Sequence, residues 1–149
     1  MVDVFDVAKW FLSKESMTHK KLQKLCYYAQ AWHYTLLGEP LFADEVQAWI
    51  HGPVIPALYN KYSKYGWRKI PQSKKKSFTF TPESLDILET VVNTYIRFDG
   101  DTLECITHAE LPWQEARKGL HPMVACTKPI TLKSMKDFYQ NLYEKEQGE

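Results

Sequence analysis

Hydrophobic residues recur at helical spacing near the start of the chain. The first stripe, typical of one face of an amphipathic helix, comprises Val4, Val7, Ala8, Phe11 and Leu12. A longer stripe begins after Thr18, a favourable N-cap residue, and stops at Gly38 and Pro40, which end helices. Its members are Leu22, Leu25, Cys26, Ala29, His33 and Leu36. The pattern predicts two helices in this part of the chain.

Start signals predict further helices downstream. Pro56 suits the first turn of a short helix that ends at Gly66 and carries Leu58, Tyr59, Tyr62 and Tyr65. Thr81 and Pro82 open another helix, since a capping hydroxyl precedes a first-turn proline. The core face expected for it comprises Leu85, Leu88, Val92, Tyr95 and Ile96.

Three shorter signals complete the pattern. Asp101 and Glu104 have capping-box spacing and introduce a helix that runs through His108. Pro112 starts a helix that ends near Gly119. Thr131 caps a last helix whose apolar face comprises Leu132, Met135, Tyr139 and Leu142. We therefore expect an all-α, compact multi-helix bundle forming one domain over residues 1–149, with one short β element near Ala48 and Phe80.

Composition and the N-terminal residues indicate the cellular compartment. The chain has 149 residues, 44% hydrophobic and 25% charged, which is ordinary for a globular domain. No apolar run is long enough for a membrane helix, and acids stand at the N-terminus where a signal peptide carries basic residues. Three cysteines, an odd number, favour reduced thiols over a disulfide framework. These features predict a cytoplasmic protein.

Charge is segregated although the net charge is only +1. Residues 46–82 hold seven Lys or Arg and no acid, whereas residues 83–115 hold eight acids and one basic residue, Arg97. Such blocks either face each other within the fold or present two surfaces of opposite sign to partners.

A search for catalytic residues yields little. No serine has the Gly-x-Ser-x-Gly flanks of a nucleophile elbow, and the six glycines stand too far apart for a phosphate-binding loop. Cys26 and Cys105 lie on apolar helical stripes, where cysteine is usually a small buried hydrophobe. We expect no enzymatic activity and no cofactor.

Two further patterns concern metal ions and nucleic acid. Cys105, His108, His121 and Cys126 have zinc-type donors, but their order matches no familiar zinc module, so no metal site is predicted. The basic stretch from Lys61 to Lys76, with interleaved aromatic residues, is a better candidate for nucleic acid and would make the protein a transcriptional regulator. Its possible basic surface comprises Lys61, Lys64, Arg68 and Lys69. The pI of about 7.7 is low for such a domain, so nucleic acid remains the alternative partner.

Several blocks of the sequence resemble one family. Residues 22–33, LQKLCYYAQAWH, are similar to the KLQKLLYYAQ-x-W signature of the Panacea domain, with Cys26 in place of a leucine. Gln47-Ala48-Trp49 followed by Gly52-Pro53-Val54 and Leu58-Tyr59 resembles its EAW-x-x-GPV-x-x-x-LY run. Residues 107–113 match its TH-x-E-x-PW motif. The family includes SocA-like antitoxins and GepA-like phage-associated proteins.

The resemblance implies an antitoxin that neutralises a co-encoded toxin by direct contact, in a prophage or mobile-element setting. A related role in the family is that of an adaptor that delivers the toxin to an ATP-dependent protease. The residues that carry the motifs, and hence the expected partner-binding site or motif core, are Trp49, His51, Gly52, Pro53, Tyr59, Thr107, His108, Glu110, Pro112 and Trp113.

Helical periodicity does not require the Gly-Pro and Pro-Trp steps in these motifs. Both fix the chain direction beside a large ring. We expect Trp49, His51, Pro53, His108, Glu110 and Trp113 to converge, with Glu110 or a backbone carbonyl orienting an imidazole. Their convergence would either brace the bundle or form the floor of a toxin-binding groove.

Overall fold

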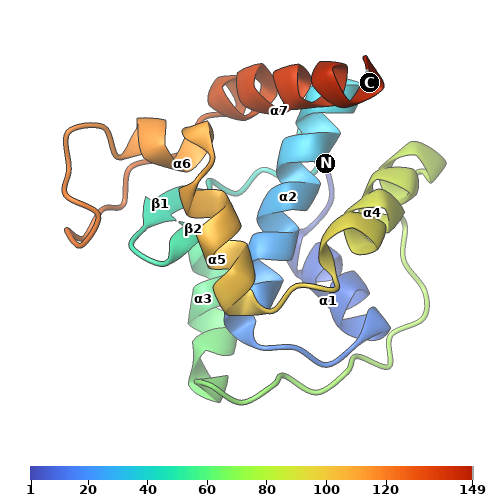
Figure 1. Ribbon diagram of the computed structural model, residues 1–149. Helices are drawn as coiled ribbons and strands as arrows, with labels where there is room; N and C mark the ends of the chain where they lie inside the picture. Colours follow the sequence, from blue (N-terminus) through green and yellow to red (C-terminus); the bar gives the residue numbers. More distant parts are fainter. Residues whose placement is uncertain (149) are drawn as a thin grey trace.

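Helix α2 (His19–Leu37) is the centre of the structure, a computed structural model that describes residues 1–148. It contacts α1, α3, α4, α5, α7 and the second strand. Figure 1 shows α2 in the middle, with α7 across its C-terminal end, α1 and α4 on one side, and α5 with the strands on the other. The remaining elements are α1 (Val4–Lys14), β1 (Gln47–Trp49), β2 (Gly52–Val54), α3 (Pro56–Tyr62), a 3-10 turn (Ser63–Tyr65), α4 (Pro82–Tyr95), α5 (Gly100–His108), α6 (Leu111–Ala116) and α7 (Leu132–Gln147).

The capping residues predicted for the long helices are confirmed. The Thr18 hydroxyl accepts from the Lys21 amide, and Gly38 ends α2 in the left-handed conformation with φ of 75°. Thr81 and Thr131 cap α4 and α7 in the same way, through the amides of Ser84 and Ser134. The mainly helical fold class is therefore confirmed.

Polar side chains of α2 hold the connecting segments against the core. Gln30 accepts from the Leu41 amide at 2.7 Å and donates to the Phe42 carbonyl at 2.8 Å. Gln23 makes the equivalent pair of bonds with the backbone of Ile55, at 2.8 and 3.1 Å. These side-chain amides therefore satisfy buried backbone groups of the segments that cross α2, among them the Leu41 and Ile55 amides.

The β element is only half as predicted. Ala48 lies in β1, which pairs antiparallel with β2, joined by a tight turn at Ile50 and His51. Phe80 does not belong to a strand. Phe78 and Phe80 instead stack on each other with ring centroids 5.6 Å apart and pack against the core, since no neighbouring segment supplies a pairing edge.

Two predictions for α4 and α5 are wrong in register. The buried face of α4 uses Ile87 and Val91 beside Leu88 and Tyr95, whereas Leu85 is exposed. Helix α5 begins two residues earlier than expected, because the N-cap is Asp99, whose carboxylate accepts from the Thr102 amide, and not Asp101.

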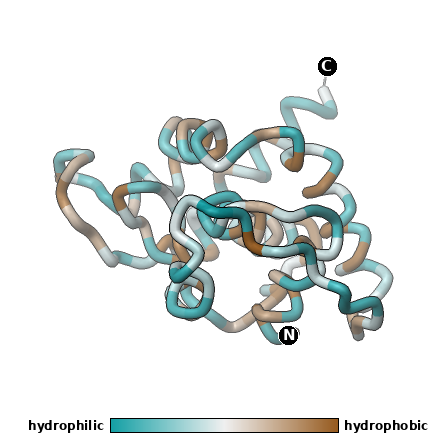
Figure 2. Tube along the Cα trace, turned by 90° about the horizontal axis from the view of Figure 1, so that it is seen from below, coloured by the Kyte–Doolittle hydropathy of each residue, from teal (hydrophilic) through white to brown (hydrophobic). Residues whose placement is uncertain are grey.

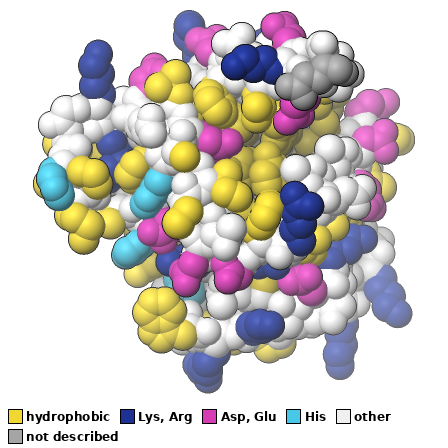
Figure 3. Space-filling view, viewed as in Figure 1, with side chains coloured by type: hydrophobic (Ala, Val, Ile, Leu, Met, Phe, Trp, Pro, Cys, Tyr) yellow, Lys and Arg dark blue, Asp and Glu magenta, His cyan; other side chains and the backbone are white. Residues whose placement is uncertain are grey.

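Three side chains placed on apolar stripes are exposed, namely Leu36, Tyr59 and Cys105. In the view of Figure 3, which is that of Figure 1, hydrophobic side chains gather on the surface between α7 and α4.

The segment between α6 and α7 projects from the body in both ribbon and tube views (Figures 1 and 2). Its exposed apolar residues are Leu120, Met123 and Val124.

Candidate functional site

The β-hairpin, α5 and α6 meet at Trp113. Its indole Nε1 donates to the Trp49 carbonyl at 2.8 Å, and its ring stacks on the His108 imidazole with centroids 3.9 Å apart. Pro112 lies beside it in the first turn of α6 and is buried. Burial lowers the pKa of His108, although the Glu104 carboxylate and the Ile50 backbone act in the opposite direction. Of the six residues predicted to converge, Trp49, His108 and Trp113 therefore do so.

Glu110 does not join that cluster. Of the two groups expected to orient an imidazole, Glu110 is therefore wrong, whereas a backbone group, that of Ile50, does bond His108. Its carboxylate faces α2 and α7, where it accepts from the Tyr28 hydroxyl at 2.7 Å and the Tyr139 hydroxyl at 2.9 Å. Tyr27 lies 2.9 Å from the Tyr139 hydroxyl and completes a buried chain. Burial raises the pKa of Glu110, and the two tyrosine hydrogen bonds partly counter this.

His51 also departs from the expected cluster. Its side chain is 69% exposed at the hairpin turn, and its Nδ1 lies 3.2 Å from the Glu104 carboxylate. Glu104 in turn pairs with Lys20 at 2.6 Å, which also reaches Asp101 at 2.9 Å. The hairpin turn is thus tied to the N-terminal end of α2 through a carboxylate of α5.

Gly52 follows this turn, and two neighbouring side chains explain why glycine stands there. It has φ of 107°, and a Cβ atom at this position would lie 2.7 Å from Lys24 Cε and 3.1 Å from Thr107 Oγ1. Lys24 passes directly beneath the hairpin, and its Nζ donates to the Pro53 carbonyl at 3.4 Å. The Gly-Pro step therefore leaves room for a buried lysine.

Arg117 is a residue that the motif analysis missed. Its guanidinium donates to the Ala48 carbonyl at 2.8 Å and to the carbonyls of His121, Pro122 and Val124. It also lies over the Trp113 ring, 4.9 Å from the centroid. This buried cation holds the projecting segment onto the hairpin. The signal available in the sequence was a lone arginine four residues after a tryptophan, the spacing of neighbours on one helix face.

A groove of about 750 Å³ runs beside this corner. We call it the hairpin groove. It is lined by the N-terminal half of α2, the hairpin, residues 99–101 and residues 125–127, together with Tyr59 and Trp67. Trp67 is 90% exposed at the groove, and Tyr59 lies between His19 and Trp49, with ring centroids 5.9 and 5.0 Å away. Trp49, His51 and Tyr59 of the predicted motif core and Lys69 of the predicted basic surface thus line one hollow.

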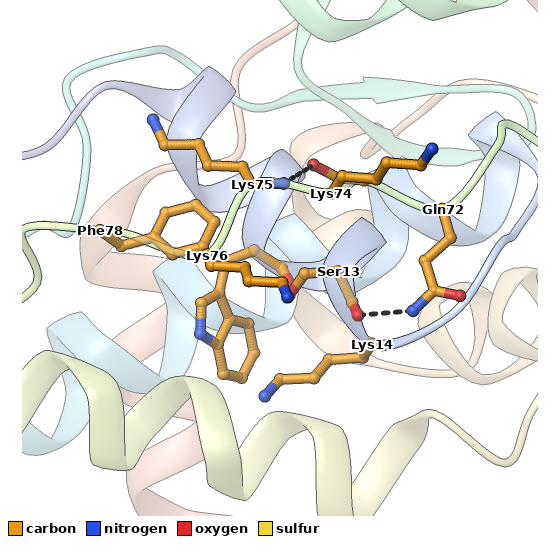
Figure 4. A pocket seen from close by; sticks show the side chains of 9 residues that line it. Ser13, Lys14, Gln72, Lys74, Lys75, Lys76 and Phe78 are labelled. Carbon is orange, nitrogen blue, oxygen red and sulfur yellow. Dashed lines mark hydrogen bonds between the residues drawn. The ribbon is translucent and has the colours of Figure 1, made fainter.

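A second hollow, of about 700 Å³, lies between α1 and the segment that precedes α4 (Figure 4). It is lined by Lys14, Lys74, Lys75 and Lys76, among others. In Figure 4 the ammonium groups of Lys74 and Lys75 point in opposite directions, and Lys75 pairs with Asp6 at 2.8 Å. These lysines do not converge on one point, so the hollow is not built around a single anion.

The predicted basic residues Lys61, Lys64, Arg68 and Lys69 are all exposed. Within residues 1–148, none of them pairs with a carboxylate, so the basic segment and the acidic segment do not neutralise each other there. In the same part of the chain, no three His, Cys, Asp or Glu side chains are placed to hold a metal ion.

Comparison with known families gives a match to the model described as antitoxin SocA-like, Panacea domain, over residues 22–114. This range begins within α2 and ends in α6, so it includes the hairpin and the Trp113 cluster. The chain belongs to this family. No curated protein and no solved structure matches it. None of the helices described for this SocA-like chain has the length and apolar character needed to cross a membrane.

Proposed function

We propose that this protein is an antitoxin that binds a toxin protein encoded nearby and neutralises it by direct contact, without catalysing a reaction, and that the hairpin groove is the contact surface. Membership of the SocA-like antitoxin family supports the antitoxin role. The groove supports the choice of surface, since it is lined by residues of the family's own motifs.

The exposed aromatic wall of the hairpin groove is the observation that carries this proposal. Trp67 leaves nine-tenths of its surface in solvent, and Tyr59 more than a third. Large rings with few rotatable bonds are favoured anchors of protein interfaces, because they bury much area at low entropic cost. Tyr59 is held between His19 and Trp49 before a partner arrives, and such preorganisation favours affinity.

The whole chain, 1–149, is proposed to act as one Panacea-type domain. The family match covers residues 22–114, yet α1 and α7 outside it contribute Val4, Phe11, Met135 and Tyr139 to the same buried cluster as α2. The proposed setting is the cytoplasm of a cell carrying a prophage or mobile element. Delivery of the bound toxin to an ATP-dependent protease fits this role, because an adaptor needs binding surfaces and no catalytic residue.

Co-expression with the neighbouring gene tests the proposal. We expect that gene to be toxic alone and to be tolerated with the wild-type chain. Trp67→Ala should lose rescue at an unchanged melting temperature, whereas the matched control Tyr143→Ala, an exposed aromatic on α7 outside the groove, should retain it. If Trp67→Ala rescues fully, the groove is not the contact surface. If no neighbouring gene is toxic, the antitoxin role itself fails.

The exposed and unneutralised basic residues Lys61, Lys64, Arg68 and Lys69 favour nucleic acid as a second candidate partner. Binding to the protein's own promoter should then weaken steeply with salt, because contacts to phosphates release counterions. A mobility shift assay at two salt concentrations, with Lys61→Ala and Lys64→Ala variants, decides this. An absent shift at low salt would remove the candidate.

A further inference from the structure

Lys24 is buried at the hairpin groove with few partners. Its side chain is 1% exposed, yet it lines the groove. Its ammonium carries three N–H donors, and the single protein acceptor is the Pro53 carbonyl at the long distance of 3.4 Å. The other buried lysine of α2, Lys21, is better satisfied, with Glu15 at 2.9 Å and the Ile96 carbonyl at 2.6 Å.

No carboxylate of the described residues pairs with Lys24. The Glu104 carboxylate attracts it, but both Glu104 oxygens are engaged, one by Lys20 and one by His51. Burial lowers the pKa of Lys24 to about 7, against the attraction of Glu104 and with the repulsion of Lys20. A buried ammonium without enough acceptors lowers the stability of the fold, unless a further acceptor completes its hydrogen bonds.

A second nitrogen in the groove lacks a partner. Nδ1 of His19 is buried without a hydrogen bond among residues 1–148. His19 and Lys24 both line the groove, together with the aromatic residues Tyr59, Trp49 and Trp67. The lining thus combines buried nitrogens that lack partners with large apolar rings.

We propose, on the basis of the antitoxin function above, that the hairpin groove binds an extended segment of the partner protein, with an Asp or Glu carboxylate of that segment on Lys24 and apolar neighbours against the aromatic wall. The carboxylate supplies the acceptors that Lys24 lacks. The stem of Lys24 packs closely against Gly52, so the direction of its side chain is set before binding.

Charge favours a peptide over a nucleic acid as the occupant. Three acids, Glu15, Asp99 and Asp101, also line the groove and offset the charge of its lysines, which disfavours a chain of phosphates. Lys20 and Lys21 are paired with acids of the protein itself, whereas Lys69 is exposed to solvent. Among the described residues that line the groove, Lys24 is the buried lysine without a carboxylate partner, and it suits one carboxylate in an otherwise uncharged segment.

The proposed pair of Lys24 and a carboxylate of the bound segment links binding to proton uptake. A bound carboxylate favours the charged form of Lys24, so its pKa rises on binding and a proton is taken up at pH 8. Lys20 and Glu104 act on Lys24, Lys24 acts in turn on His19 and His108, and His51 lines the same groove. Burial lowers the pKa of His19 and His108, Glu104 is held ionised by Lys20 and His51, and Lys20 has a raised pKa. Lys24 is therefore the group expected to take up the proton.

The test uses the full chain and an array of synthetic octapeptides, each with one central Glu between apolar or aromatic residues, and each with a Gln twin. We expect Glu members to bind at least about tenfold more tightly than their twins, the effect of one charge-assisted hydrogen bond to a buried group. Lys24→Met should abolish the preference, whereas Lys21→Met should keep it because its ammonium is already paired. Calorimetry in buffers of different ionisation enthalpy should detect proton uptake at pH 8.

Equal binding of Glu peptides and their twins, or a preference that survives in a folded Lys24→Met variant, overturns the inference. If Lys24→Met fails to fold, the absence of proton uptake by the wild-type protein overturns it instead. Tighter binding of an oligonucleotide than of every peptide assigns the groove to nucleic acid. This outcome also refutes the inference that the groove binds a carboxylate-bearing peptide. Toxin rescue is read separately, so rescue by wild type without any Glu preference leaves the antitoxin role standing while this inference falls.

Discussion

The Glu110 carboxylate offers a direct test of how α7 is held on α2. It accepts hydrogen bonds from Tyr28 and Tyr139, whose rings are buried on the two helices. Glu110→Ala leaves the Tyr28 hydroxyl without an acceptor, whereas Tyr139 keeps Tyr27. Losing two hydrogen bonds to a carboxylate and stranding one buried donor should cost on the order of 2–5 kcal/mol. For a chain of this size that corresponds to a fall in melting temperature of roughly 5–15 °C.

The pH dependence of a second variant tests the same reasoning more finely. Burial raises the folded-state pKa of Glu110, so the folded protein binds this proton more tightly than the unfolded chain does. The stability contributed by the protonated group is fully present below the unfolded pKa and is lost as pH rises through the folded pKa. Glu110→Gln keeps an acceptor oxygen but has no proton to lose.

The assay is thermal unfolding of wild type and Glu110→Gln at several pH values between about 4 and 7, with the difference in melting temperature as the readout. Other titrating groups are common to both proteins and cancel in the difference. We expect the melting temperature of the variant to rise relative to that of the wild type as pH rises. If the melting temperature of the wild type rises relative to the variant instead, the ionised carboxylate is the favoured form in the fold. Hydrogen bonding by the tyrosines then outweighs the effect of burial on the Glu110 pKa.

Three further predictions concern packing and backbone. Leu25→Ala should cost on the order of 2–5 kcal/mol in chemical denaturation, because Leu25 is fully buried on α2, and wild-type stability would contradict its placement. Gly52→Ala should destabilise the fold by roughly 1–3 kcal/mol, because φ is positive at this position and the new Cβ would meet Lys24. An unchanged melting temperature would refute this close packing of Lys24 against Gly52. Arg117→Lys should speed amide exchange in residues 121–126, since one ammonium cannot replace a fork that reaches four carbonyls, whereas Lys118→Arg should leave it unchanged.

Local chemistry in the sequence was sufficient to place most helices. Thr18, Gly38, Thr81 and Thr131 act through hydrogen bonds or backbone angles within a few residues of themselves, so their effect does not depend on the rest of the fold. The family signature was likewise legible, since its blocks lie in a fixed order along the chain. The Gly-Pro and Pro-Trp steps were correctly singled out as features that helical periodicity does not explain.

Tertiary structure decided which face of each helix is buried and which polar groups meet. Helix α4 has apolar residues over a wide arc, and contact with α2, including the bond between His33 Nε2 and Ser84 Oγ at 2.8 Å, selected Ile87 and Val91 over Leu85. Glu110 could have faced either the imidazole or the tyrosines, and the position of α7 chose the tyrosines. The burial of Lys24 and the four-carbonyl grip of Arg117 depend on segments far away in sequence. Such pairings follow from long-range packing, which short-range periodicity does not encode.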